Sequence, residues 1–200
     1  MPRRLICLLA MTGVASAESI DTPVAALPAD VGDQGIGGAI GVAAGGRSTA
    51  GGLRLAGHYF YQLSDVDWFD GSASFVFGSG GAECFRDRMD VVICDHGLAD
   101  GYEVEISANV RRYLPALANE TFLPFLRAGL GVALVRFSDD EITGIAFPLH
   151  LGAGLRVGVA DGIAVTGQAD LEIGLARFSD GLGGEPQLGL NIMAGAEFRL

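Results

Sequence analysis

The chain has 200 residues, with 13 basic and 24 acidic side chains and a formal net charge of −11. A chain this acidic lacks the clustered basic groups that nucleic-acid phosphates require, so we expect no nucleic-acid partner. Half of the residues are hydrophobic and 31 are glycine, yet beyond the N-terminus no apolar run reaches the roughly 20 residues of a membrane-spanning helix.

The N-terminus has the three parts of a secretory signal peptide. Arg3 and Arg4 provide a positive segment, residues 5–14 an apolar segment, and Ala15-Ser16-Ala17 a cleavage site of small residues. We therefore expect residues 1–17 to direct Sec-type export and then to be removed.

The rest of the chain divides into a short lead-in and one domain. Pro23 and Pro28 interrupt residues 18–35, which we expect to form an irregular periplasmic lead-in. Residues 36–200 contain eight segments in which apolar side chains alternate with polar or small ones. Because successive side chains of a strand point to opposite faces, each segment predicts a β-strand with one apolar face. The predicted strands are 37–45, 52–62, 67–78, 102–113, 122–137, 147–159, 163–175 and 187–200.

The last segment shows the alternation most fully. One of its faces carries Leu188, Leu190, Ile192, Ala194, Ala196, Phe198 and Leu200. The other face is polar or very small, as expected of a strand that lies between lipid and a polar interior. Bacterial membrane barrels have an even number of strands, and eight satisfies that rule. The sequence therefore predicts an all-β fold, an eight-stranded antiparallel up-and-down transmembrane β-barrel with meander topology.

The connections between the predicted strands differ in length on the two sides of this barrel. Those on one side are 63–66, 114–121 and 160–162, and those on the other are 46–51, 79–101, 138–146 and 177–186. Short turns face the periplasm in outer-membrane barrels, and longer loops face outward. The asymmetry predicts the cell outer membrane of a Gram-negative bacterium. Aromatic residues near the strand ends, among them Tyr113 and Phe137, are expected to form girdles at the two interfaces.

Charged side chains recur on the faces predicted to point inward. They are Arg54, Glu103, Glu105, Arg111, Arg127, Arg156, Asp170, Glu172, Glu197 and Arg199. The interior of an eight-stranded barrel is just wide enough for side chains to fill, and buried charges must be paired. We therefore expect salt bridges across the lumen and no open pore. The pairs expected are Arg127 with Glu103 or Glu105, and Arg156 with Asp170 or Glu172.

Other residues that could carry chemistry receive structural interpretations. His58 and His150 point inward and are expected to be hydrogen-bonded packing elements. Cys84 and Cys94 remain after the expected cleavage, and in an oxidising periplasm they should form one disulfide within a loop. A metal site there would need further ligands, so we expect no metal and no other cofactor.

The second half of the chain resembles a known family. Its segments LPFLRAGLGV (123–132) and FPLHLGAGLRVGVADGIAV (147–165), with the terminal strand, are similar to the outer-membrane β-barrel superfamily. That superfamily includes the barrel of outer-membrane protein A and small barrels such as outer-membrane protein X. The resemblance implies that Gly195, Phe198 and Leu200 form the signal presented to the barrel-assembly machinery, although Leu200 stands where phenylalanine is commoner.

The function expected is that of a non-enzymatic, monomeric barrel with a structural role or one carried by its loops. Its partners would be outer-membrane lipid, lipopolysaccharide and the assembly machinery. One alternative is an enzyme of the lipid A deacylase type, but this chemistry needs a serine, a histidine and a carboxylate on the lipid-facing side. Ser72 and Ser74 point inward instead. A narrow channel and a soluble calycin-like barrel are further alternatives, and the second would require the inward charges to face water.

Overall fold

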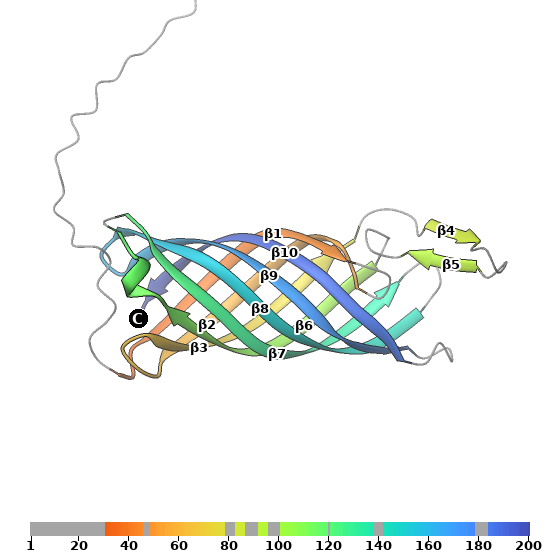
Figure 1. Cartoon of the computed structure of the whole chain (residues 1–200), viewed down its shortest axis with the longest axis horizontal. Coiled ribbons are helices and arrows are strands. Elements are labelled where there is room, and N and C mark those ends of the chain that lie inside the picture. Colours follow the sequence, from red (N-terminus) through yellow and green to blue (C-terminus); the bar gives the residue numbers. More distant parts are fainter. Residues whose placement is uncertain are drawn as a thin grey trace, which may run out of the picture.

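The computed structural model describes residues 31–45, 49–78, 83–86, 92–95, 101–119, 121–137, 142–178 and 184–200. Eight long strands form one barrel, and a separate hairpin projects beyond one of its ends (Figure 1). The barrel strands are β1 (Gln34–Gly45), β2 (Gly52–Gln62), β3 (Asp67–Phe77), β6 (Gly101–Tyr113), β7 (Leu123–Phe137), β8 (Ile142–Ala160), β9 (Ile163–Phe178) and β10 (Gly184–Arg199). The hairpin consists of β4 (Glu83–Arg86) and β5 (Val92–Asp95).

The barrel closes between its first and last strands. Its order is β1-β10-β9-β8-β7-β6-β3-β2, and every neighbouring pair is antiparallel. Ile40 of β1 lies opposite Ala194 of β10, so the terminal strand is the closing strand. The predicted fold class, strand number and meander topology are therefore confirmed.

Several strands are longer than the sequence predicted. β1 begins at Gln34, β8 at Ile142 and β10 at Gly184, while β9 continues to Phe178. Apolar alternation marks only the part of a strand with a continuous apolar face, whereas backbone hydrogen bonding continues past it. The hairpin β4–β5 falls in a region predicted to be one long loop, and its two four-residue strands are too short to show a period.

Helical structure is minimal in the described part of the chain. The one-turn helix η1 (Pro115–Leu117) lies in the connection between β6 and β7. None of the helices in the described ranges is long and apolar enough to span a membrane.

The barrel is polar inside and apolar outside. On β6, Glu103 and Arg111 are each 1% exposed, whereas Ile106 between them is 70% exposed. The same alternation runs along the other barrel strands, where Leu130 of β7 and Leu175 of β9 face outward. A soluble barrel would bury the apolar face and expose the charges. The calycin-like alternative is therefore wrong for the described barrel.

Two apolar clusters lie within the barrel near its ends. The loop-side cap, toward the longer connections, consists of Ala43, Ala50, Val76, Ala133, Val135, Phe137, Ala146, Ala176 and Phe178. The turn-side cap, at the end of the short turns, consists of Phe60, Trp68, Tyr113, Leu123 and Phe125. Tyr113 and Phe137 were expected in the interface girdles, but their positions on the inward rows of β6 and β7 place them in the caps.

Candidate functional site: the polar lumen

The space between the two caps contains a network of buried polar side chains. Of the charged residues predicted to face the lumen, Arg54, Glu103, Glu105, Arg111, Arg127, Asp170, Glu172 and Glu197 are buried, and Arg156 is partly buried. Arg199 is different, because 47% of its side chain is exposed and it pairs with Asp33 at the turn-side end. It therefore does not belong to the buried network.

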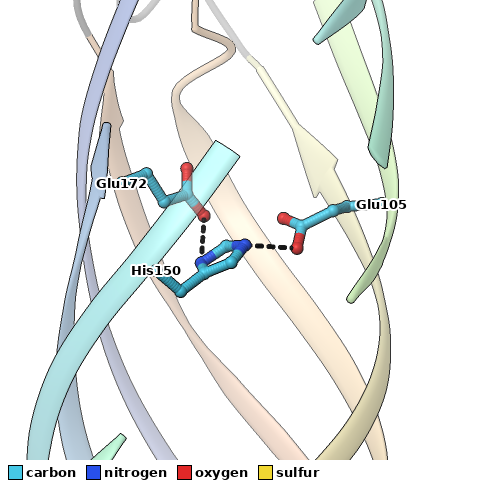
Figure 2. Close-up of side chains that lie close together, drawn as sticks. All are labelled: Glu105, His150 and Glu172. Atoms are coloured by element: carbon cyan, nitrogen blue, oxygen red, sulfur yellow. Dashed lines mark ion pairs between the residues drawn. The ribbon is translucent and has the colours of Figure 1, made fainter. Parts of the chain in front are cut away.

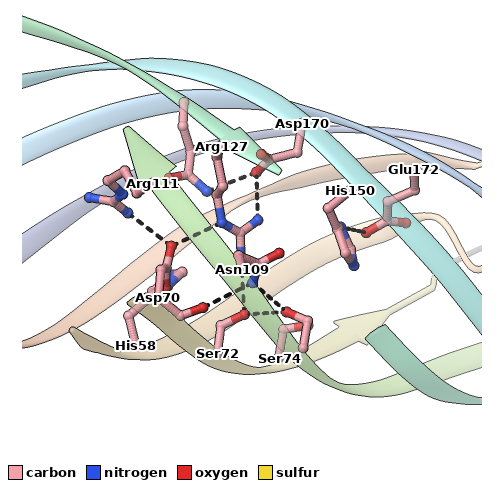
Figure 3. Close-up of polar contacts among 12 residues, drawn as sticks. His58, Asp70, Ser72, Ser74, Asn109, Arg111, Arg127, His150, Asp170 and Glu172 are labelled. Atoms are coloured by element: carbon pink, nitrogen blue, oxygen red, sulfur yellow. Dashed lines mark hydrogen bonds and ion pairs between the residues drawn. The ribbon is translucent and has the colours of Figure 1, made fainter. Parts of the chain in front are cut away.

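Asp70 of β3 is the carboxylate with the most side-chain partners in this network (Figure 3). It was not among the charged residues that the sequence predicted to face the lumen. Its Oδ1 atom lies 2.8 Å from Nδ1 of His58, and its Oδ2 atom accepts a hydrogen bond of 2.9 Å from Nε of Arg127. Arg111 approaches the same Oδ2 atom at 3.3 Å. The inward parity of Asp70 was recognisable in the sequence, but its central position depends on how the strands are arranged around the lumen.

Arg127 connects Asp70 to the opposite wall of the barrel. Its Nη1 atom lies 3.4 Å from Oδ2 of Asp170 on β9, and its Nη2 atom donates a hydrogen bond of 3.1 Å to Oγ of Ser72. Gln168 donates to the same oxygen of Asp170 at 2.8 Å. One guanidinium thus links β7 with β3 and β9, which are not its neighbours in the sheet.

Arg111 occupies the boundary between the network and the turn-side cap. Its guanidinium carbon lies 4.6 Å from the centre of the Phe60 ring and 4.3 Å from that of Phe125. It forms an ion pair with Glu197, which Arg156 also approaches at 3.2 Å. Cation–π contacts and two carboxylates together compensate for the burial of this charge.

A second group of charges lies nearer the loop-side cap. Arg54 of β2 donates to Oε1 of Glu172 at 2.5 Å, to Oε2 of Glu105 at 2.6 Å and to Oγ of Ser74 at 2.9 Å. His150 of β8 lies between the two carboxylates (Figure 2). Its Nε2 atom is 2.7 Å from Oε1 of Glu105, and its Nδ1 atom is 3.6 Å from Oε1 of Glu172.

The salt-bridge partners predicted from the sequence were wrong. Arg127 pairs with Asp70 and Asp170, because the antiparallel register places Glu105 opposite Ala133, toward the other end of β7. Arg156 pairs with Glu197 for the same reason, since its neighbour on β9 is Thr166. The predicted partners lie on adjacent strands, but the prediction did not include the register between those strands.

The described cavities in the lumen are small. One of about 10 Å³ is lined by His58, Phe60, Arg111 and Glu197 among others, and one of about 40 Å³ opens at the turn-side end beside Trp68. A cavity must have a volume of at least roughly 10–15 Å³ to hold one water molecule. These spaces therefore suit one to a few waters rather than a substrate.

The remaining sites predicted from the sequence lie outside the lumen. The backbone register places Cys84 directly opposite Cys94, but the side chains of the hairpin lie outside the described residues, so the disulfide stays a prediction. Gly195 pairs with Ala39 of β1, while Phe198 faces outward and Leu200 follows the end of β10. The assembly role of these three residues also stays a prediction.

Comparison with solved structures finds the same fold in small outer-membrane barrels. Neisserial surface protein A is 12% identical, with a TM-score of 0.59 over 84% of this chain and 96% of that chain. The N-terminal β-barrel domain of OprF from Pseudomonas aeruginosa is 16% identical, with a TM-score of 0.50 over 84% and 99% of the two chains. The attachment invasion locus protein Ail of Yersinia pestis, solved with the heparin analogue sucrose octasulfate, is 15% identical, with a TM-score of 0.50 over 86% and 100%.

No protein-family model and no curated protein matches the sequence. At identities this low, the structural likeness establishes the fold, and it agrees with the resemblance seen in the sequence.

Proposed function

We propose that this protein is an integral outer-membrane β-barrel whose role is structural or is carried by its loops, without an open pore. The observation that carries the proposal is the apolar belt, which surrounds the barrel and includes Ile40, Ile106, Leu130, Leu175 and Ile192. Each of these side chains is more than half exposed. A protein partner would cover one side of such a belt, whereas a lipid bilayer covers all sides at once.

The outer membrane is the membrane that best fits the other features. Closed barrels are the β-structures that can satisfy every backbone group within lipid. The secretory segment expected at residues 1–17 and the short turns at one end support export and a periplasmic position of that end. The partners proposed are outer-membrane lipid, lipopolysaccharide and the barrel-assembly machinery.

The packed lumen supports the proposal that no open pore exists. Apolar caps lie near both ends, and ion pairs link opposite walls between them. The purified protein in a planar bilayer should give no stable conductance steps, whereas steady single-channel currents would contradict this part of the proposal.

The arrangement of polar groups supports a non-enzymatic role. A lipid-modifying barrel enzyme would need a serine and a histidine on the outer face. His58 and His150 are both buried in the lumen, and the Oγ atom of Ser72 is hydrogen-bonded to Ser107 at 2.6 Å. Unchanged lipid A acylation in cells that overproduce the protein is the expected result, and loss of an acyl chain would contradict it.

Loop composition bears on what the surface could bind. Residues 138–141 read Ser-Asp-Asp-Glu, and residues 79–100 contain more acidic than basic side chains. Such loops would repel a sulfated sugar of the kind bound to Ail. We therefore propose that any ligand of these loops is neutral or cationic.

A gel assay tests the membrane assignment directly. Outer-membrane fractions should be prepared, extracted with carbonate, and run on SDS gels with and without boiling. The protein should resist extraction and should migrate differently in the two lanes, because the closed barrel survives SDS until it is heated. Equal migration together with release into the soluble periplasm would overturn the proposal.

A further inference from the structure

The charges of the buried network are not evenly distributed. Toward the turn side, three arginines are matched by three carboxylates. These are Arg111, Arg127 and Arg156 with Asp70, Asp170 and Glu197. The loop-side cluster, defined as Arg54, Glu103, Glu105, His150 and Glu172, has three carboxylates and one guanidinium. The cluster therefore contains two more carboxylates than guanidinium groups, and burial makes such an excess costly.

His150 brings ligand atoms together within this cluster. The side chains of Glu105, His150 and Glu172 each offer one metal-ligand atom, and these atoms all lie within 4.8 Å of one another (Figure 2). Although Nε2 of His150 is only 2.7 Å from Oε1 of Glu105, it makes no hydrogen bond of acceptable geometry. Two ligand atoms therefore face each other at close range.

Glu103 is a second, independent observation. It is 1% exposed, and neither of its carboxylate oxygens has a side-chain hydrogen-bond partner of acceptable geometry among the described residues. On β6 it is the buried residue next to Glu105 on the same inward row, toward the loop-side cap. A buried carboxylate without a geometrically sound partner is costly unless another charge compensates for it.

Glycines of the barrel wall leave room at this point. A Cβ atom at Gly131 of β7 would lie 2.8 Å from Oε1 of Glu105 and 3.1 Å from Nε2 of His150. The missing side chain lets Glu105 of β6 and His150 of β8 meet across the intervening strand. Gly189 likewise leaves room for Glu172, because a Cβ atom at Gly189 would lie 3.2 Å from Oε2 of Glu172.

We propose that the loop-side cluster binds one divalent transition-metal ion such as Zn²⁺, with Glu105, His150 and Glu172 as ligands. Carboxylate oxygens and an imidazole nitrogen are ligands that such ions accept. Two positive charges would balance the excess of the cluster. Ligand atoms around tetrahedral zinc are about 3.4 Å apart, so the contact between Nε2 and Oε1 would open by less than about 1 Å.

Arg54 would then be a positioning residue. It holds Oε2 of Glu105 at 2.6 Å and leaves Oε1 directed toward His150. Outer partners of this kind orient ligands and contribute to metal affinity.

The site lies between the loop-side cap and the centre of the lumen, so the ion would enter as the barrel forms. The test is therefore made by refolding. Urea-denatured protein is folded into detergent with Zn²⁺ or with EDTA, freed of unbound metal by gel filtration, and measured for metal content and thermal unfolding. We expect about one Zn²⁺ per chain and a higher unfolding temperature for the zinc-refolded protein.

Variants distinguish this site from binding elsewhere on the chain. Glu105→Gln and His150→Gln should each weaken zinc binding by at least about tenfold, as measured by competition with a chelator of known affinity. His58→Gln is the matched control, because it alters the other described buried histidine, which contacts Asp70 rather than this cluster. A shift of the folded band on unboiled SDS gels shows that each variant has formed its barrel.

Three results would overturn the proposal. They are a zinc-refolded protein without bound metal, equal binding by the His150→Gln and His58→Gln variants, and unfolding temperatures that depend on pH but not on zinc. The last result would mean that bound protons, and not a metal ion, supply the missing positive charge. None of these outcomes affects the membrane assignment, which the gel assay tests separately.

Discussion

At the scale of single residues, the lumen contains charged side chains whose burial would be costly without partners. Asp70 is fully buried, yet His58, Arg111 and Arg127 surround its carboxylate. Removing one member of such a group leaves its partners buried and uncompensated, which destabilises a fold more than the pair stabilises it. Asp70 is therefore the residue of the turn-side network whose loss should be felt most.

We predict that Asp70→Asn lowers the free energy of unfolding by about 3–5 kcal/mol, because it removes the negative charge between two buried arginines. Urea titration in detergent, followed by the folded band on unboiled gels, measures the change. The control is Asp67→Asn, since Asp67 pairs with Arg112, whose side chain is 62% exposed. Solvent screens that pair, so the control should change little. Equal losses in both variants would contradict the importance of the buried network.

Substituting an inward-facing glycine should also destabilise the fold, as substituting a buried charge does. A Cβ atom at Gly154 would lie 2.3 Å from Cζ of Phe125 and 2.6 Å from the carbonyl oxygen of Gly167. Gly154→Ala should therefore cost about 1–3 kcal/mol through overpacking. Gly57→Ala is the matched control on the outer face, where a Cβ atom meets nothing within 4 Å. The same urea titration should show no loss for Gly57→Ala, and equal losses would contradict the assigned faces.

At the scale of elements, the sequence predicted the strands well because lipid and lumen impose a period of two on each of them. It did not predict the start of β8 or the end of β9, where backbone pairing continues beyond the apolar alternation. It also predicted the wrong ion pairs. Arg127 reaches Asp70 from β7 to β3 past the intervening β6, and such contacts follow from barrel closure rather than from any local pattern.

The loop-side cluster shows which signal could have found more of the site. Glu105 and His150 come from strands separated by β7, and Gly131 of that strand leaves the gap between them. A glycine on an inward row, flanked by charged inward positions on both neighbouring strands, is visible in the sequence once the register is known. The register itself was the missing information.

The hairpin β4–β5 carries one prediction at this scale. Its register places Cys84 and Cys94 opposite each other. Directly opposite residues of an antiparallel pair have Cα atoms about 4.5–5.5 Å apart, which a disulfide can bridge. We expect a mass-spectrometric digest without reductant to contain the two cysteines in one linked peptide pair. Complete alkylation of both thiols before reduction would contradict the disulfide.

At the scale of the whole molecule, the fold is an inverted one. Apolar side chains cover the outside of eight strands, charged side chains lie inside, and apolar caps lie near both ends of the barrel. This inversion is stable only if lipid covers the outer surface, so the barrel and its membrane form one structural unit. The surface outside the membrane is then the part of the molecule that remains accessible to partners.

The single tryptophan provides the most direct measurement of this inversion. Trp68 is buried in the turn-side cap, whereas Leu130, near the middle of β7, is 66% exposed on the outer face. The protein should be reconstituted into bilayers with brominated acyl chains, which quench indole fluorescence on contact. We predict weak quenching of Trp68 and strong quenching in a Trp68→Phe/Leu130→Trp variant. Strong quenching of Trp68 with weak quenching of the indole introduced at position 130 would contradict the inverted barrel.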